Sequence, residues 1–297
     1  MWKNYFLKKL INIMLKSNAD FDALMRSIEE SDSGYSKLIT HITKNSDVLM
    51  KIGDRILESE TIFSMFARYI SNKGSDEKCQ YKVSYAQSGE DLIIDFVFKT
   101  VGINKPSYID IGAYDPYKFS NTAFFYLNGS RGINIEPNPK QYERFVRYRG
   151  EDTNLNIGIS DRAGELDYYF MDSPTLNTFS QTEAERYERE EGHKIIDTKK
   201  IKVDTIESVV NSYCNKLFPD LLTIDAEGRD KMILQSIDYN NNFPSIICLE
   251  TLSYSQKGKE MKDRELIDYL IDKGYFLYAD TYINSIFVRE EIWRPQP

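Results

Sequence analysis

Carboxylates follow several short apolar runs in this sequence, and their spacing points to a shared binding edge. The acidic residues at the ends of these runs are Asp110, Glu136, Asp161, Asp225, Glu227 and Glu250. If the runs are strands of one parallel sheet, their carboxyl ends meet at the edge where such sheets bind ligands. Single acids often end strands, because strands stop where polarity begins. Five successive strand ends with a polar or acidic group predict a functional edge.

The turn after the first run restricts the ligand. It reads DIGAYDP, so it carries one glycine, Gly112, instead of the G-x-G-x-x-G that holds a dinucleotide pyrophosphate. Its carboxylates, Asp110 and Asp115, repel phosphate and attract a cation. Glu136, at the end of the second run, is placed to accept both hydroxyls of a ribose. A cationic, phosphate-free ligand that bears a ribose has the properties of S-adenosylmethionine, and Gly112 would let the backbone approach it.

Alternating strands and helices are predicted to position these residues. The strands are expected at 107–113, 132–137, 154–160, 216–228 and 244–251, with a hairpin-like pair at 275–280 and 285–290. The helices are expected at 119–129, 139–150, 229–238 and 262–275. Repeated β-α units with short apolar strands predict an α/β fold, in which helices cover both faces of a mostly parallel sheet.

Composition excludes some classes of protein. The 297 residues carry a net charge of −8, which argues against a nucleic-acid binder. Three widely spaced cysteines (Cys79, Cys214 and Cys248) favour a reducing cytoplasm over a disulfide framework. The start, MWKNYFLKKLINIMLK, reads as an amphipathic helix rather than a signal peptide or membrane span, with surface membrane contact as the lesser alternative. We expect a cytoplasmic protein.

Residues 1–78 differ from the rest and are predicted to form a separate helical region before a domain at 79–297. They contain no proline, and the polar stretch SNKGSDEKCQ reads as a linker. A helical seam is expected at Leu49, Ile52, Ile56, Phe63, Phe66 and Ile70. This seam either packs onto the main domain or joins copies of the chain in a homo-oligomer.

Residues 84–290 resemble the FkbM family of S-adenosylmethionine-dependent methyltransferases. The resemblance is carried by SYAQSGEDLIIDFVF, YIDIGAYDPYKFSNTAFFY, GINIEPNP, NIGISDRAGELDYYF, SPTLNTFS, KVDTIESVV, LLTIDAEGRDKMIL and IICLET, in this order. It implies a Rossmann-like sheet of seven strands with the last antiparallel. It also implies methyl transfer, usually to a hydroxyl on a sugar, glycolipid or natural product, often in surface-polysaccharide pathways.

The resemblance implies a set of cofactor-binding residues. These are Gln87, Gly89, Glu90 and Asp91 in a segment over the cofactor, Asp110, Gly112 and Ala113 in the cofactor loop, Ser120, Asn121 and Thr122 near the methionine, Glu136 at the ribose, and Ser160 and Asp161 at the adenine. Each has a plainer interpretation, in which a glycine serves a turn or a serine or asparagine caps a helix.

Catalysis is assigned to Asp225, Glu227 and Glu250. A hydroxyl acceptor loses a proton, so these carboxylates are candidate bases. The acids of DAEG can instead hold a divalent metal such as Mg²⁺ through oxygen ligands, or cap the helix that begins near Arg229. No residue is assigned as a metal ligand.

The acceptor is predicted to be a sugar or glycan precursor, bound partly by the hydroxyl-rich loop 171–181. Two other functions stay open at this point. One is N-methylation of an amine or phosphoramidate group. The other is a catalytically inactive cofactor-binding module in which the N-terminal helices organise an assembly.

Overall fold

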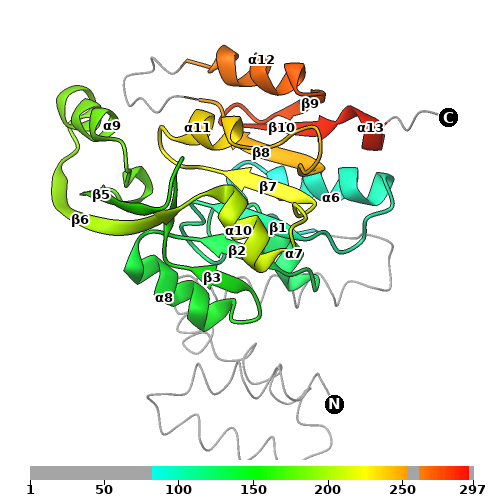
Figure 1. Ribbon diagram of the computed structural model, residues 1–297, viewed down its shortest axis with the longest axis horizontal. Helices are drawn as coiled ribbons and strands as arrows, with labels where there is room; N and C mark the ends of the chain where they lie inside the picture. Colours follow the sequence, from blue (N-terminus) through cyan, green and yellow to red (C-terminus); the bar gives the residue numbers. More distant parts are fainter. Residues whose placement is uncertain (1–81, 253–260, 294–297) are drawn as a thin grey trace, which may run out of the picture. The chain divides into compact units, whose positions relative to one another are not determined.

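The computed structural model describes residues 82–252 and 261–293 (Figure 1). The predicted helical region at 1–78, its boundary and its seam lie outside these residues. Within the described part, no helix has both the length and the apolar character needed to span a membrane.

The main sheet has seven strands in the order β3-β2-β1-β7-β8-β10-β9. Their bounds are β1 Tyr108–Ile111, β2 Gly132–Ile135, β3 Thr153–Leu155, β7 Leu221–Ile224, β8 Ile246–Glu250, β9 Tyr275–Asp280 and β10 Asn284–Arg289. All pairs are parallel except those of β10, which runs antiparallel to β8 and β9. The predicted fold, a mostly parallel sheet with its last strand antiparallel, is confirmed.

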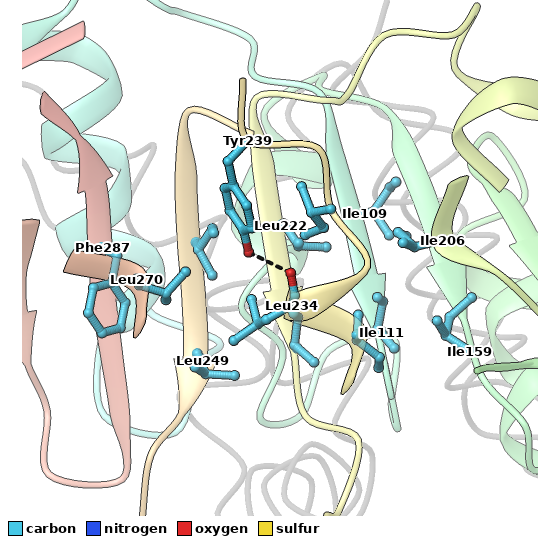
Figure 2. Packing of buried hydrophobic residues seen from close by; sticks show 14 of the residues in the cluster. Ile109, Ile111, Ile159, Ile206, Leu222, Leu234, Tyr239, Leu249, Leu270 and Phe287 are labelled. Carbon is cyan, nitrogen blue, oxygen red and sulfur yellow. Dashed lines mark hydrogen bonds between the residues drawn. The ribbon is translucent and has the colours of Figure 1, made fainter. Parts of the chain in front are cut away.

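Helices cover both faces of this sheet because its strands are apolar on both sides (Figure 1). On β1, Ile109 and Ile111 point to one face and Tyr108 to the other. The face of Ile109 packs against α10 (Ile206–Tyr213), α11 (Asp230–Gln235) and α12 (Arg264–Asp272). Figure 2 shows this core, in which the Tyr239 hydroxyl donates to the Leu234 carbonyl at 2.9 Å. The opposite face packs against α6 (Glu90–Thr100), α7 (Ala123–Leu127) and α13 (Glu290–Trp293).

The helices that follow β1 and β2 differ in how their N-termini are formed. Helix α8 (Pro139–Tyr148) has Asn138 as its N-cap, whose side-chain oxygen accepts the Lys140 N–H at 3.1 Å, and Pro139 is its first residue. Helix α7 is shorter than the predicted 119–129. Phe119 has a φ of 56°, a left-handed conformation that a helix cannot include, so the residues before Ala123 form a loop.

The third predicted strand, 154–160, is wrong as a single element. β3 ends at Leu155, and Gly158–Ile159 form β4 in a second sheet of order β4-β6-β5. Asn156 separates the two, because its side-chain amide donates to the Glu136 and Pro137 carbonyls at 2.8 and 2.9 Å.

The second sheet is an insertion between β3 and β7. Its long strands are β5 (Gly164–Met171) and β6 (Ile195–Asp204), which pair antiparallel. Between them lie the short 3-10 helix Pro174–Leu176, α9 (Gln181–Arg186) and a π-helical turn, Tyr187–Glu191. This insertion brings the loop between β5 and α9 to the main sheet.

Candidate active site

A pocket of about 260 Å³ lies at the carboxyl ends of the central strands, where the strand order reverses on either side of β1. The predicted residues that line it are Gln87, Asp110, Gly112, Ala113, Asn121, Glu136, Asp225, Glu227 and Glu250. The predicted residues outside its lining are Gly89, Glu90, Asp91, Ser120, Thr122, Ser160 and Asp161.

Gly112 lies where the backbone after β1 closely approaches the backbone after β7. Its φ is 74°, and a Cβ at this position would lie 1.8 Å from the Asp225 carbonyl oxygen. The Gly112 N–H donates to the Ile135 carbonyl at 3.0 Å, and the Asp225 N–H donates to the Ile111 carbonyl at 3.0 Å. The glycine is therefore required by the close approach of the Asp225 backbone, whereas the sequence suggested room for a ligand.

Glu136 is fixed by two backbone donors. Its carboxylate accepts the Tyr114 N–H at 2.8 Å and the Asn138 N–H at 2.7 Å. Burial raises the pKa of Glu136 to about 8, with smaller contributions from Asp110 and Asp225, while the two backbone bonds oppose the rise. This carboxyl group is held in one orientation at the pocket, and an arriving cation would favour its ionised form.

Asp110 is held by a buried polar network. Its carboxylate accepts the Thr122 hydroxyl at 2.6 Å, and the same hydroxyl accepts a bond from Arg149 at 2.9 Å. Arg149 is fully buried and pairs with Asp152 at 2.9 Å. Burial raises the pKa of Asp110 to about 6, opposed by Thr122 and Arg149. Thr122 thus does not line the pocket but holds the Asp110 carboxylate that does.

The three predicted catalytic acids meet in the pocket. Carboxylate oxygens of Asp225, Glu227 and Glu250 all lie within 4.8 Å of one another. Desolvation raises the pKa of Asp225 to about 7, with a further rise from Asp230, although Asp225 reaches solvent through the pocket. A hydrogen bond from Glu250 opposes that rise, while burial and Asp225 raise the pKa of Glu250 well above its usual range. Burial and mutual repulsion therefore raise the pKa values of all three carboxyl groups above their usual range.

The alternative in which the DAEG acids cap the next helix is wrong. The N-cap residue of α11 is Arg229, and no side chain makes a cap hydrogen bond there. Glu227 has a φ of 43°, its carbonyl accepts the Thr178 hydroxyl at 2.7 Å, and its carboxylate accepts the Tyr187 hydroxyl. Asp230 instead ties the loop, because it accepts the Ala226 N–H at 3.0 Å. These contacts position the loop that carries Asp225.

The segment before α6 approaches the pocket through one residue. Gln87 is exposed and lines it, while Gly89 has a φ of 90° and precedes the helix. Glu90 accepts the Asn284 side-chain amide at 3.0 Å, and Asp91 accepts a backbone N–H of the preceding loop at 2.7 Å. Both acids are fully buried, so they anchor the segment that presents Gln87.

In the loop before α7, Ser120 has a structural role and Asn121 is a candidate ligand-binding residue. Ser120 accepts the Ala123 N–H at 3.1 Å, which is a structural role. Asn121 donates to the Thr223 hydroxyl at 3.0 Å, and its buried side-chain oxygen has no partner among the described residues. This oxygen belongs to a pocket-lining residue and is a candidate acceptor for an ammonium group.

Ser160 and Asp161 do not lie at the edge of the main sheet. They follow β4, where the Ser160 hydroxyl donates to Asp161 at 3.0 Å and the Asp161 side chain is exposed. The prediction placed them at the end of β3, and the split at Asn156 moves them to the second sheet. Gly158 and Ile159 line the pocket in their place.

The loop between β5 and α9 forms a wall of the pocket through residues 174–179. The rings of Tyr168 and Phe179 lie 4.6 Å apart, and the Phe179 ring fills the space where a Cβ on Gly158 would lie. Tyr168 also lines the pocket, and sequence reasoning missed it together with Tyr187. The alternating pattern of 164–171 was the only available signal for Tyr168.

The strand order, the single antiparallel strand and the pocket at the strand ends define a Rossmann-like α/β fold with an acidic ligand site. A family model for the methyltransferase FkbM domain matches residues 110–277, more than half of the chain. The chain therefore belongs to the FkbM methyltransferase family, and its methyl donor is S-adenosylmethionine. No curated protein matches the sequence.

Solved structures give weaker similarities. A protein from Pyrococcus horikoshii assigned as an RNA methyltransferase is 9% identical, with 75% of this chain and 96% of that chain covered and a TM-score of 0.36. A 1,6-didemethyltoxoflavin-N1-methyltransferase from Burkholderia thailandensis, with 1,6-didemethyltoxoflavin and S-adenosylhomocysteine bound, is also 9% identical. There 68% of this chain and 79% of that chain are covered, with a TM-score of 0.35. Neither similarity bears on the acceptor.

Proposed function

We propose that this methyltransferase methylates a hydroxyl group of a sugar or glycan precursor. The observation that carries the proposal is the cluster of Asp225, Glu227 and Glu250, which shares one pocket with Asp110 and Glu136. A hydroxyl gives up its proton when its oxygen is methylated, so this acceptor class requires a base within reach. A neutral amine attacks without prior loss of a proton, so the cluster favours O-methylation over N-methylation.

The proposed step is an in-line displacement. The bond between the acceptor oxygen and the methyl carbon forms as the carbon–sulfur bond breaks, and S-adenosylhomocysteine leaves with a neutral sulfur. The hydroxyl proton passes to the Asp225 carboxylate, whose pKa of about 7 suits a base at neutral pH. Holding oxygen, carbon and sulfur in line contributes up to about 7–11 kcal/mol in well-aligned systems.

The same carboxylates also fit a divalent cation. Their oxygens lie within 4.8 Å of one another, and carboxylate oxygens are the ligands that Mg²⁺ and Ca²⁺ prefer. Asp225, Glu227 and Glu250 would hold the ion, whose chemistry is to lower the pKa of a bound hydroxyl. Loss of turnover with a chelator, restored by Mg²⁺, separates this version from the metal-free one.

The lining of the pocket supports a saccharide. Gln87 and Thr175 contribute exposed polar side chains. Phe119 also lines the pocket and keeps 48% of its surface exposed, so its ring offers an apolar face to a sugar ring. The combination of polar groups and one accessible ring suits a ligand with hydroxyls on its edge and C–H groups on its face.

A labelled-methyl assay tests the proposal. The full chain is incubated with methyl-labelled S-adenosylmethionine and a panel of saccharides, nucleotide sugars and matched amino sugars, and products are identified by mass spectrometry. We expect label on a saccharide oxygen. Label on nitrogen alone, or on no saccharide at all, overturns the proposal.

A further inference from the structure

Arg229 is the one basic side chain among the described residues that line the pocket. It lies four positions after Asp225, immediately before α11. The acidic residues that surround the same space are Asp110, Glu136, Asp225, Glu227 and Glu250. A single guanidinium in such a lining either forms ion pairs with these acids or is available to bind an anionic group of the ligand.

The contacts of Arg229 within the described residues are few and long. One terminal nitrogen donates to the Ser160 hydroxyl and the other to the Phe179 carbonyl, each at 3.4 Å. Its Nε is buried and has no hydrogen-bond partner in the described part of the chain. A guanidinium carries five N–H donors, so most of this binding capacity is unused.

Among the residues that the structure describes, the polar contacts of Arg229 go to a hydroxyl and a carbonyl, not to a carboxylate of the pocket. Burial lowers the pKa of Arg229, and Asp161, outside the pocket lining, partly offsets this effect. The rise in the pKa of Asp225 is opposed by Glu250, and that of Glu227 by the Tyr187 hydroxyl, rather than by Arg229. The guanidinium therefore keeps a partly desolvated charge that the protein leaves poorly compensated, which is costly unless a ligand supplies an anion.

We infer that Arg229 binds an anionic group of the methyl acceptor, either the carboxylate of a uronic acid or the phosphate of a sugar phosphate. The inference rests on the proposed function, since it specifies the saccharide that the pocket takes. A guanidinium matches both groups through paired N–H donors. The remaining lining repels anions, so the anionic end is directed to Arg229 and a hydroxyl of the same molecule toward Asp225.

Calorimetric titration of the full chain, saturated with S-adenosylhomocysteine, tests this role. The probes are glucuronate, glucose 6-phosphate and glucose. We expect at least one anion to bind about tenfold or more tightly than glucose, and about tenfold to hundredfold more weakly to Arg229→Gln. Arg229→Lys should keep part of the affinity, and Arg264→Gln, an exposed arginine outside the pocket lining, should keep all of it.

The preference between glucuronate and glucose 6-phosphate identifies whether Arg229 binds a carboxylate or a phosphate. Equal binding of the anions and glucose by the parent protein overturns the inference without any variant. Equal anion binding by the parent and Arg229→Gln also overturns it. A large loss of S-adenosylhomocysteine affinity in Arg229→Gln, at unchanged melting temperature, means that Arg229 serves the cofactor and again overturns it.

The two proposals fail in different ways. Methyl transfer to neutral saccharides with no effect of Arg229→Gln leaves the proposed function standing and removes the role of Arg229. Arg229-dependent methylation of anionic acceptors that contain no sugar keeps the role of Arg229 and removes the saccharide.

Discussion

Replacing Asp225 by asparagine tests whether this residue takes the acceptor proton. The substitution nearly keeps the shape of the side chain and removes its ability to accept a proton. Turnover at saturating cofactor and acceptor should fall by about 10²–10⁴, the usual contribution of a positioned base. Cofactor affinity should change little, because Asp110 and Glu136 remain.

The pH dependence of turnover gives a second measure of the same role. A base acts only when deprotonated, so the rate should rise with pH through the pKa of Asp225, which is about 7. Turnover of the parent protein should therefore rise between pH 6 and pH 8, and the residual turnover of Asp225→Asn should lack this rise.

As pH rises, the stability contributed by Asp225 should fall while turnover rises. The pKa of Asp225 is raised in the folded state, so the unfolded chain loses this proton at lower pH, and stability falls as pH rises toward about 7. Asp225→Asn should therefore melt at a higher temperature than the parent at pH 8. Asp272→Asn, on an exposed site away from the pocket, is the matched control. Unchanged turnover and an unchanged pH profile in Asp225→Asn would refute its role as the base.

Three further predictions concern the cofactor and the domains. Glu136→Ala should weaken S-adenosylmethionine binding by about tenfold to hundredfold in calorimetry, because bonds to a charged acceptor are worth about 1.5–3 kcal/mol, and NAD should not bind the parent protein; unchanged affinity contradicts the ribose assignment. Binding of S-adenosylmethionine should tighten from pH 6 to pH 8 more than binding of S-adenosylhomocysteine. The raised pKa values of Asp110 and Glu136 leave these groups partly protonated, and the sulfonium adds a positive charge that favours their ionisation and that S-adenosylhomocysteine lacks. Parallel pH profiles contradict this. A protein lacking residues 1–75 should stay folded and bind the cofactor, with any change confined to the association state in light scattering. An insoluble product would mean that these residues belong to the core.

The strand ends were predictable because they depend on local pattern. Short apolar runs followed by an acid predicted β1, β2 and β7, and β-α alternation placed their ends at one edge. Asp110, Glu136 and Asp225 line one pocket for this reason. Parallel strands buried on both faces show this pattern clearly, since few polar residues interrupt them.

Long-range pairing explains what the sequence did not predict. Asn156 ends β3 by donating to backbone carbonyls 20 and 19 residues away along the chain, which no local pattern records. Arg149 falls at the end of the predicted helix 139–150, where no sequence signal marked it, yet it is fully buried and bonded to Asp152 and Thr122. Glu90 matches a family motif, but its bond to Asn284 joins distant parts of the chain.

Several predictions about the whole protein stay predictions. They are the helical region at 1–78, its role in a homo-oligomer, the cytoplasmic location, the lack of a nucleic-acid partner and the lesser alternative of membrane-surface contact. The predicted boundary and helical region lie outside the described residues.

A crystal structure of the full chain with S-adenosylhomocysteine tests the central claim most directly, because it locates the cofactor among the acids of the pocket. We predict that the ribose hydroxyls donate to Glu136 and that the sulfur faces the cluster of Asp225, Glu227 and Glu250. A cofactor bound away from Glu136, or with its sulfur turned from this cluster, would contradict the account.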